Sequence, residues 1–196
     1  MMTYSTVADI WRPGERTHAL LYNISLIFGG SVLLALSAQL AIGRPVPFTM
    51  QEFAVLMIGA LFGSRLASMT VGLYLLEGFA GLPVFAHHLG GLPVLLGPTG
   101  GFLVGFLAAA YVTGFLAERG WDRKFTTTTL AMLAGNVLIY TFGLIRLNFL
   151  FGFHEALVTG LYPFAAGAVT KILVAAALLP SVWRLLQRCG LLDKIK

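Results

Sequence analysis

The stretch from Gly78 to Gly101, GFAGLPVFAHHLGGLPVLLGPTGG, decides how the rest of the chain is interpreted. It holds seven glycines and three prolines within 24 residues, which is too many helix breakers for a membrane helix. It is also apolar, unlike an ordinary surface loop. Irregular backbone at membrane depth persists only where protein buries it or where it lines a cavity. The stretch therefore predicts the lid or wall of a ligand cavity in a membrane protein.

The composition of the whole chain is that of an integral membrane protein. Of its 196 residues, 58% are hydrophobic and 11% are charged, and the mean hydropathy is +0.86. This length leaves room for about six spans of roughly 20 residues, so we expect residues 1–196 to form a single transmembrane domain. The polar stretch 1–18 is expected to be a cytoplasmic N-terminal segment and not a cleaved signal peptide. Basic residues at span ends explain the net charge of +5 without nucleic-acid binding.

The number of spans is decided by charge. Five apolar runs are visible, and an odd number would place the two ends of the chain on opposite sides of the membrane. Basic residues near both ends, Arg16 and Arg188 among them, indicate that both termini are cytoplasmic. The apolar run 53–76 contains Arg65 near its middle, so we expect two short helices joined by a tight turn. The alternative is one long helix whose Arg65 points into the bundle.

The predicted fold is therefore an all-α integral membrane protein with six transmembrane helices and both termini in the cytoplasm. We expect a multi-pass protein of the inner (plasma) membrane, embedded in the lipid bilayer. The expected helices span about 19–42, 52–63, 65–77, 99–118, 127–150 and 156–187.

Lys171 is the most informative polar residue within a predicted span. A lysine this far from both ends of an apolar run is costly and by default functional. We expect it to face the cavity and to pair with a ligand carboxylate or with a protein acid, for which Glu77 and Glu155 are candidates. The same two acids are candidate partners for Arg146. The alternative is a lysine that snorkels to the outer surface.

Two further pairs offer hydrogen bonds to a polar ligand. Asn136 and Tyr140 lie one turn apart and share a helix face, although a buried asparagine also commonly bridges two helices. Thr49 and Gln51 follow two prolines at the start of the next predicted helix. The alternative for that segment is a plain loop with an N-cap threonine.

The segment 97–101, GPTGG, opens another predicted helix. The free amides around Thr99 and Gly100 favour an anionic or carbonyl group, and the alternative is a helix start that packs against a neighbour. His87 and His88 are adjacent and lack a spaced third ligand, so we expect no metal and no cofactor. No catalytic arrangement of residues stands out, which argues against an enzyme.

Small residues recur four apart on the first predicted helix. They are Ser31 with Ala35 and Ser37 with Ala41. Such spacing allows two helices to approach closely. The residues predict a docking face for another membrane subunit if they face outward, and packing within the chain explains them equally well.

Several segments together stand in an order typical of one family. They are PVPFTMQ (45–51), YLLEGFAGLPVF (74–85), GPTGGF (97–102), Asn136 with IYTFG (139–143), and PFAAG…K (163–171). The chain thereby resembles the BioY family, the biotin-binding S components of energy-coupling factor (ECF) transporters. The resemblance implies a six-helix S-component fold, and capture of biotin at the outer face followed by its translocation. It also implies a partner module of one transmembrane coupling subunit and two cytoplasmic ATPases.

Some positions depart from the family pattern. The aspartate usual in the last helix is Ala168, whereas Lys171 is kept, which implies recognition of the valerate carboxylate of biotin. We expect His87 and Asn136 to take over hydrogen bonds to the ureido ring. Arg146 stands where a tryptophan is common, and no sequence pattern explains it. The candidate ligand-binding residues are thus Lys171, Asn136, Tyr140, Gln51, Thr49, Phe85, His87, Gly91, Thr99 and Gly100.

Three other functions stay open on the residues alone. The chain could be the binding subunit for a different vitamin, a membrane-embedded enzyme, or a purely structural membrane subunit. Competition between vitamins, chemical turnover of a ligand, and the absence of saturable binding would respectively identify them.

Overall fold

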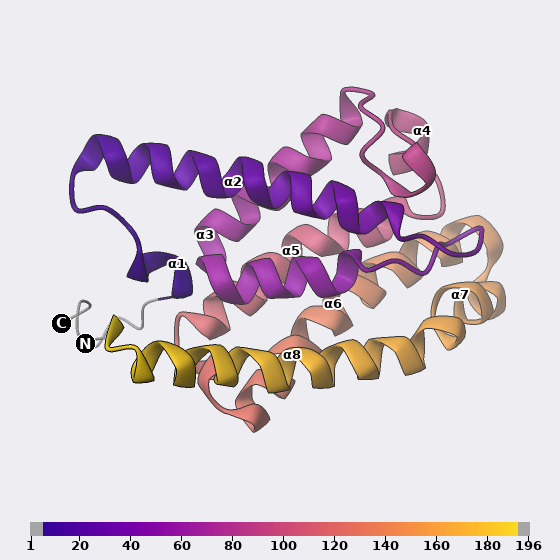
Figure 1. Cartoon of the computed structure of the whole chain (residues 1–196). Coiled ribbons are helices and arrows are strands. Elements are labelled where there is room, and N and C mark those ends of the chain that lie inside the picture. The colour runs from indigo at the N-terminus through magenta and orange to yellow at the C-terminus, as the bar shows by residue number, and fades with distance from the viewer. Residues whose placement is uncertain (1–5, 192–196) are drawn as a thin grey trace.

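The computed structural model describes residues 6–191 as a bundle of long helices (Figure 1). No β-strand occurs in this range, which holds only two isolated bridges, Ile42 with Phe48 and Phe85 with Leu89. The helices are α1 (Val7–Ile10), α2 (Arg16–Gln39), α3 (Gln51–Phe79), η1 (Ala86–His88), α4 (Leu92–Leu96), α5 (Gly100–Ala117), η2 (Trp121–Arg123), α6 (Phe125–Phe151), α7 (Phe153–Gly160) and α8 (Tyr162–Arg188).

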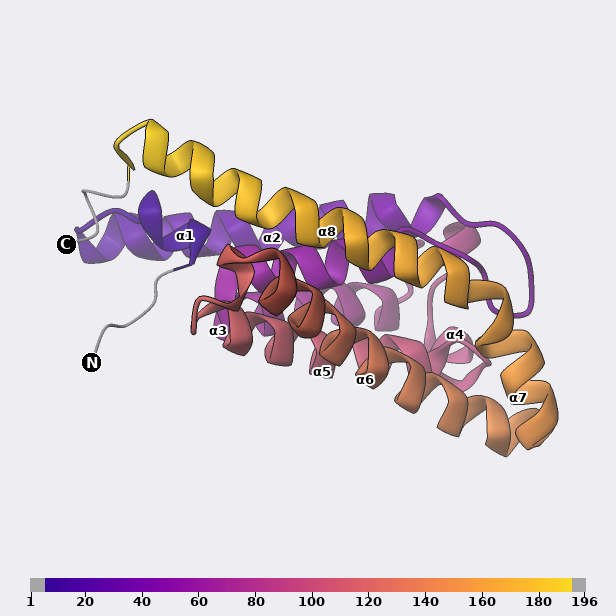
Figure 2. The same cartoon turned by 90° about the horizontal axis from the view of Figure 1, so that it is seen from below.

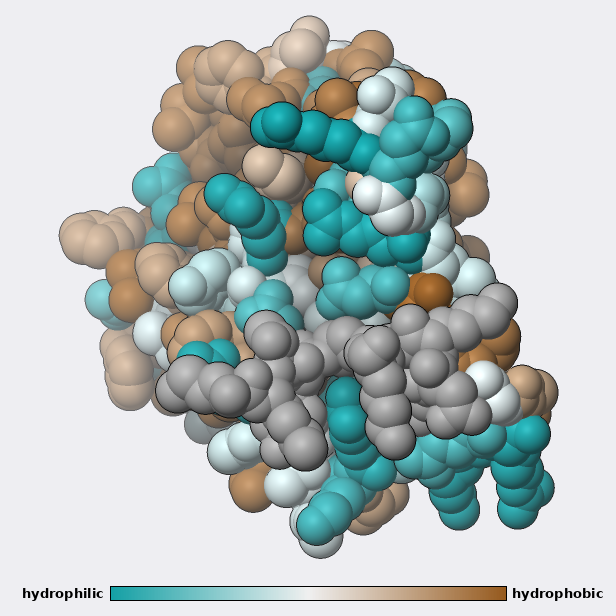
Figure 3. Space-filling model, turned by 90° about the vertical axis from the view of Figure 1, so that its left-hand side faces the viewer, coloured by the Kyte–Doolittle hydropathy of each residue, from teal (hydrophilic) through white to brown (hydrophobic). Residues whose placement is uncertain are grey.

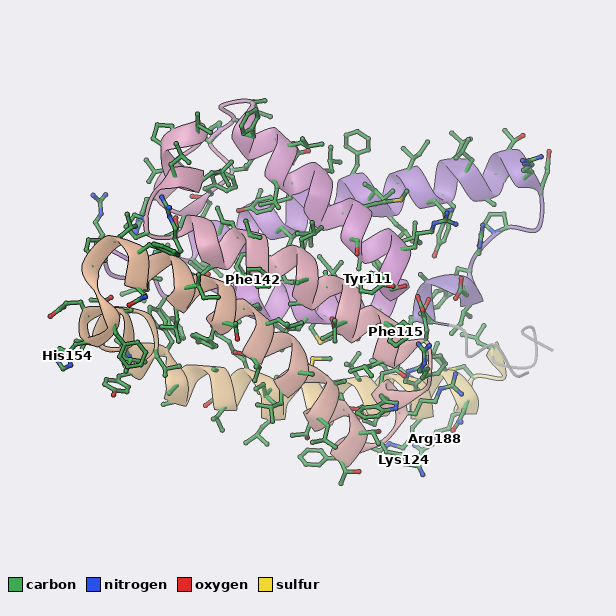
Figure 4. All side chains as sticks on the ribbon, turned by 180° about the vertical axis from the view of Figure 1, so that it is seen from behind. Tyr111, Phe115, Lys124, Phe142, His154 and Arg188 are labelled. Atoms are coloured by element: carbon green, nitrogen blue, oxygen red, sulfur yellow. The ribbon has the colours of Figure 1, made fainter. Side chains whose placement is uncertain are left out.

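Five helices in the described range are long and apolar enough to cross a membrane, namely α2, α3, α5, α6 and α8. The helices α5 and α6 run side by side, and α7 joins α6 to α8 at one end of the bundle (Figure 2). Large apolar side chains cover the outer surface. Figure 4 shows Tyr111, Phe115 and Phe142 on the outer side of α5 and α6, where all three are exposed. A surface of this kind suits contact with lipid, so the chain is a membrane protein with an all-α fold.

The run 53–76 does contain a turn. Gly63 has φ +82° and ψ 169°, which interrupts α3, and the chain reverses direction within this element (Figure 1). One carboxylate oxygen of Glu118, at the end of α5, accepts hydrogen bonds from the backbone N–H (2.7 Å) and the hydroxyl (2.8 Å) of Ser64. Glu118 thus caps the second half of α3 with a negative group where free amides favour one. Arg65 is exposed at this turn, so the alternative in which it points into the bundle is wrong.

Both described ends of the chain lie at the same end of the bundle. Val7 and Ile10 of α1 pack against Trp183 and Leu186 near the end of α8. Figure 3 shows hydrophilic side chains gathered on this end, and Figure 4 shows Lys124 and Arg188 here and His154 at the opposite end. We name it the basic end, after Arg12, Arg16, Arg65, Arg119, Arg123, Lys124, Arg184 and Arg188.

Two expected boundaries need correction. The helix expected over 156–187 is two helices, because Leu161 (φ −124°, ψ −57°) separates α7 from α8. Pro163 lies in the first turn of α8, where backbone N–H groups have no partner within the helix, so proline costs no helical hydrogen bond there. The helix expected over 19–42 is shifted toward the N-terminus, since α2 begins at Arg16 and ends at Gln39.

The small residues of α2 largely pack within the chain. Ser31 and Ser37 are buried, and the Ser31 hydroxyl donates a hydrogen bond to Glu77 Oε1 at 3.0 Å. Ala35 is half-buried, and so is Ala41, which lies beyond the end of α2 and therefore not on this helix as expected. Large side chains such as Phe28 and Leu36 form the exposed face of α2.

A buried carboxylate connects the α5–α6 loop to α8 at the basic end. Asp122 of η2 is 1% exposed, and its Oδ2 accepts a hydrogen bond from the Trp183 indole N–H. The Arg123 guanidinium lies over the same indole ring, 4.5 Å from its centroid. Asp122 Oδ1 is buried without a hydrogen-bond partner within residues 6–191. Burial raises the pKa of Asp122 to about 6, although the bond from Trp183 opposes the shift.

Replacement of Gly63 by alanine should destabilise the protein. A side chain at φ +82° is strained, and the added Cβ would lie 2.8 Å from Glu118 Oε1 and 3.0 Å from Thr6. We expect a loss of about 2 kcal/mol, measured as a lower thermal midpoint in detergent. Gly72→Ala is the matched control, because nothing lies within 4 Å of its added Cβ and alanine favours helix. Equal midpoints for the two variants would contradict this account of the turn.

The Asp122 environment predicts a pH dependence of stability. Its pKa is raised in the folded protein, so its contribution to stability is complete below about pH 4 and is lost as the pH rises through about 6. Asp122→Asn removes the titration. The thermal midpoint of the variant relative to wild type should therefore increase between pH 4.5 and pH 7.5, by on the order of 5 °C. A difference that stays constant with pH would show that Asp122 titrates normally.

Candidate functional site

A cavity of about 700 Å³ opens at the end of the bundle opposite the basic end. The loops before α3 and after it cover the first turns of α3, α5 and α8 there. Its walls are mainly apolar and carry a few polar groups. The lining residues are Arg44, Pro45, Val46, Pro47, Thr49, Gln51, Glu52, Phe85, Ala86, His87, Leu89, Gly90, Pro93, Val94, Gly97, Pro98, Thr99, Phe102, Leu103, Phe106 and Phe164.

The loop that follows α3 is folded back onto that helix. Gln51 Nε2 donates a hydrogen bond to the Tyr74 hydroxyl at 2.6 Å, and this hydroxyl donates to the Val84 carbonyl at 3.2 Å. The Phe85 ring meets Tyr74 edge-on, with 5.5 Å between centroids. Phe85 also packs directly on Gly78, where an added Cβ would lie 2.0 Å from the ring. The glycine thus permits the loop to close over the cavity.

The loop after α3 is fastened to α2 by Gln39, at the end of that helix, and to the loop before α3 by His87. Its Nε2 donates to the Phe85 carbonyl at 3.1 Å, and its Oε1 accepts from the backbone N–H of His88 at 3.0 Å. His87 Nε2 lies 3.3 Å from the Gly43 carbonyl of the other loop. These bonds satisfy backbone groups that an apolar loop would otherwise leave unpaired. Gln39 was not among the residues picked from the sequence.

Arg146 of α6 holds the short helix α4. Its guanidinium donates to the carbonyls of Leu96 and Gly97, the second at 3.4 Å. A positive group at the C-terminal carbonyls of a helix satisfies acceptors that have no helical partner. This contact supplies a structural reason for an arginine at this position.

The polar centre of the site is formed by Lys171, Glu52 and Tyr140. Lys171 Nζ donates to Glu52 Oε2 at 2.9 Å and to the Thr49 carbonyl at 2.6 Å. The Tyr140 hydroxyl donates to the other carboxylate oxygen, Glu52 Oε1, at 3.0 Å. The ammonium also lies 4.1 Å from the centroid of the Phe48 ring. All three polar residues are buried, and the network ties α3 to both α6 and α8.

Lys171 thus pairs with a protein acid, but the acid is one that sequence reasoning missed. Glu77 accepts a hydrogen bond from Ser31, and Glu155 is exposed, so neither is the partner of Lys171. A signal for Glu52 was present, since an acid begins an apolar run while a lysine lies in another span. Two opposite buried charges need each other, because each alone is costly to bury.

The structure brings only part of the candidate set to the cavity surface. Thr49, Gln51, Phe85, His87 and Thr99 line it. Lys171 and Tyr140 lie behind Glu52, which lines the cavity and contacts both.

The other three candidates shape or underlie the site. Gly91 has φ +87°, and its N–H donates to the Gly78 carbonyl at 2.7 Å. Gly100 lies so close to the Leu95 carbonyl that an added Cβ would be 1.7 Å from the oxygen. Asn136 is 2% exposed, and its Nδ2 has no hydrogen-bond partner in the described range. No cluster of three His, Cys, Asp or Glu suited to a metal ion occurs among residues 6–191.

Comparison with known proteins gives a consistent result. A family model described as the BioY family matches residues 12–188. A Thermotoga maritima protein named Biotin transporter BioY is 38% identical over 151 residues, covering 76% of this chain and 88% of that protein. A Rhizobium etli protein of the same name is 38% identical over 157 residues, covering 75% and 83%.

The fold also has a counterpart of known structure. The crystal structure described as the S-component for biotin from an ECF-type ABC transporter matches with a TM-score of 0.76. The match covers 87% of this chain and 95% of that chain, at 23% sequence identity. At this identity the likeness shows the fold.

The buried pair of Glu52 and Lys171 predicts how single and double substitutions change the stability of the protein. Glu52→Leu or Lys171→Met alone leaves one buried charge unpaired and should cost about 3 kcal/mol or more. The double variant Glu52→Leu/Lys171→Met removes both charges and should be more stable than either single variant. Thermal midpoints without ligand test this, with Glu155→Leu as an exposed control that should change little. Additive losses in the double variant would contradict a direct pair.

Proposed function

Because the chain belongs to the BioY family, we propose that it captures biotin in this cavity and carries it across the membrane. The observation that carries the proposal is the open-mouthed cavity of about 700 Å³, which is mainly apolar and is lined by a few polar groups. Small-molecule sites commonly have this size and character. The relatives reported above are named as transporters, and this chain is a transporter and not an enzyme.

The chemistry of the cavity suits the parts of biotin. The thiophane ring and valerate chain are apolar, and Phe85, Phe102 and Phe164 offer apolar walls. The ureido ring needs hydrogen-bond donors and acceptors, which Thr49 and Gln51 supply.

The carboxylate of biotin needs a cation. Lys171 already donates to Glu52 and to a backbone carbonyl, and it lies behind the cavity wall. Arg44 lines the cavity and is exposed at its rim. A guanidinium at the rim can bind a carboxylate without full desolvation of either charge. We therefore assign the carboxylate of biotin to Arg44. Lys171 acts on the site indirectly, through its ion pair with Glu52.

The proposal also covers the number of spans, the orientation in the membrane and the partner subunits. The turn at Gly63 divides α3 into two short spans, which would give six spans and place both termini on one side. The positive-inside rule assigns the basic end to the cytoplasm and the cavity to the outer face of the inner membrane. We propose that the chain works with an ECF module of one transmembrane coupling subunit and two cytoplasmic ATPases; transport by the chain alone is the alternative.

Calorimetric titration of the detergent-purified protein with biotin tests the ligand. We expect tight binding with one biotin per chain, and thiamine or riboflavin in excess should not compete. If a folded protein gives no heat of binding with biotin, or if another vitamin displaces bound biotin, the assignment is refuted and a different vitamin is supported as the ligand.

The position of the carboxylate can be tested with biotin and biotin amide. Arg44→Gln should weaken binding of biotin by about 10-fold and leave the amide nearly unchanged, because only biotin loses an ion pair. Ala86→Gly, at another lining residue, is the control and should affect both ligands equally. A loss selective for biotin in Lys171→Ala, and not in Arg44→Gln, would place the carboxylate at Lys171 instead.

A further inference from the structure

We propose that Glu52 selects the ligand by accepting a hydrogen bond from a ring N–H, which in biotin belongs to the ureido group. This inference rests on the function proposed above and identifies the residue that would hydrogen-bond to the ureido ring.

Glu52 is a charged group in a mainly apolar wall. Its side chain is 11% exposed, and that exposure is toward the cavity that it lines. Burying a carboxylate costs several kcal/mol unless other groups compensate for it. Lys171 compensates the charge from behind the wall, at 2.9 Å. The pair can therefore present a negative group to the cavity while the protein is stable and empty.

The carboxylate has acceptor capacity left for a ligand. Each carboxylate oxygen can accept about two hydrogen bonds. In residues 6–191, Lys171 donates to Oε2 and Tyr140 donates to Oε1, one bond to each oxygen. The remaining lone pairs of Glu52 are unused there, and it is Glu52, not Lys171 or Tyr140, that lines the cavity.

The charge determines which ligand group fits beside Glu52. A second carboxylate would be repelled, and a carbonyl or ether oxygen would face an acceptor with no proton between them. A ring N–H satisfies the carboxylate with a charge-assisted bond. The ureido ring of biotin supplies such donors, whereas its carboxylate end is directed to the rim.

The two donors behind Glu52 fix its position. Lys171 holds one oxygen from α8, and Tyr140 holds the other from α6. The Phe102 ring, which lines the cavity, meets Tyr140 edge-on with 6.1 Å between centroids. Lys171 and Tyr140 are therefore positioning residues, because they orient the acceptor without lining the cavity.

The test compares biotin with its two cyclic carbamate analogues, in which an oxygen atom replaces one ureido N–H or the other. The shape is kept, so only the donor is lost. Wild type should bind one analogue about 10- to 100-fold more weakly than biotin, as for a lost hydrogen bond to a charged group. Glu52→Gln removes the charge at nearly constant size and should reduce that discrimination below about 5-fold.

Glu77→Gln is the matched control, since it changes the other acid of α3, which is half-buried and has Ser31 as its partner. It should keep the full discrimination of wild type. If Glu52→Gln proves too unstable to titrate, the charge-neutral variant Glu52→Gln/Lys171→Met takes its place, with the same expected loss of discrimination.

Three other outcomes would overturn the inference, two of them without affecting the proposed function. Tight biotin binding by wild type without discrimination against either carbamate would overturn the inference alone. So would discrimination that survives unchanged in Glu52→Gln. A folded wild-type protein that binds no biotin would overturn the proposed function and this inference with it.

Discussion

The rest of the site depends on the buried pair of Glu52 and Lys171. It links α3 to α8, and through the Tyr140 hydroxyl it also includes α6. Neither charge would be tolerated alone in an apolar bundle, so each fixes the other. Because Thr49 contributes its carbonyl to the same ammonium, the pair also sets where the loop before α3 ends. A cavity wall and the packing of three helices thus share one electrostatic constraint.

The second constraint is the need to satisfy backbone groups in apolar loops. The loop after α3 contains the breakers that no helix accepts, and its carbonyls and amides need partners. Long polar side chains from the neighbouring helices supply them: Gln39 from α2, Tyr74 from α3 and Arg146 from α6. The loop is therefore held by the bundle at several points, which makes it a wall of defined shape.

Composition predicted the helical membrane class, charge predicted the turn near Arg65, and the helix breakers predicted the cavity wall. The turn was recognisable because Arg65, a charged residue in an apolar run, needs a route to solvent. The partners could not be predicted, because they are fixed by packing between distant segments. Glu52 pairs with Lys171, which lies 119 residues away in the sequence, and Glu118 caps the helix at Ser64, 54 residues away. The break at Leu161 was hidden because an apolar run continues through it.

A carrier must be stable both with and without its ligand, and this limits how it can use charge. A lysine kept free for a ligand carboxylate would be an unpaired buried cation whenever the site is empty. In this chain the ammonium is neutralised internally, and the carboxylate that neutralises it keeps spare acceptor capacity on the cavity side. The empty site then contains no unpaired buried charge at its centre. In the proposed binding mode, a neutral ligand donor would replace water at Glu52 and the only new ion pair would form at the exposed rim, which would allow the ligand to be released again.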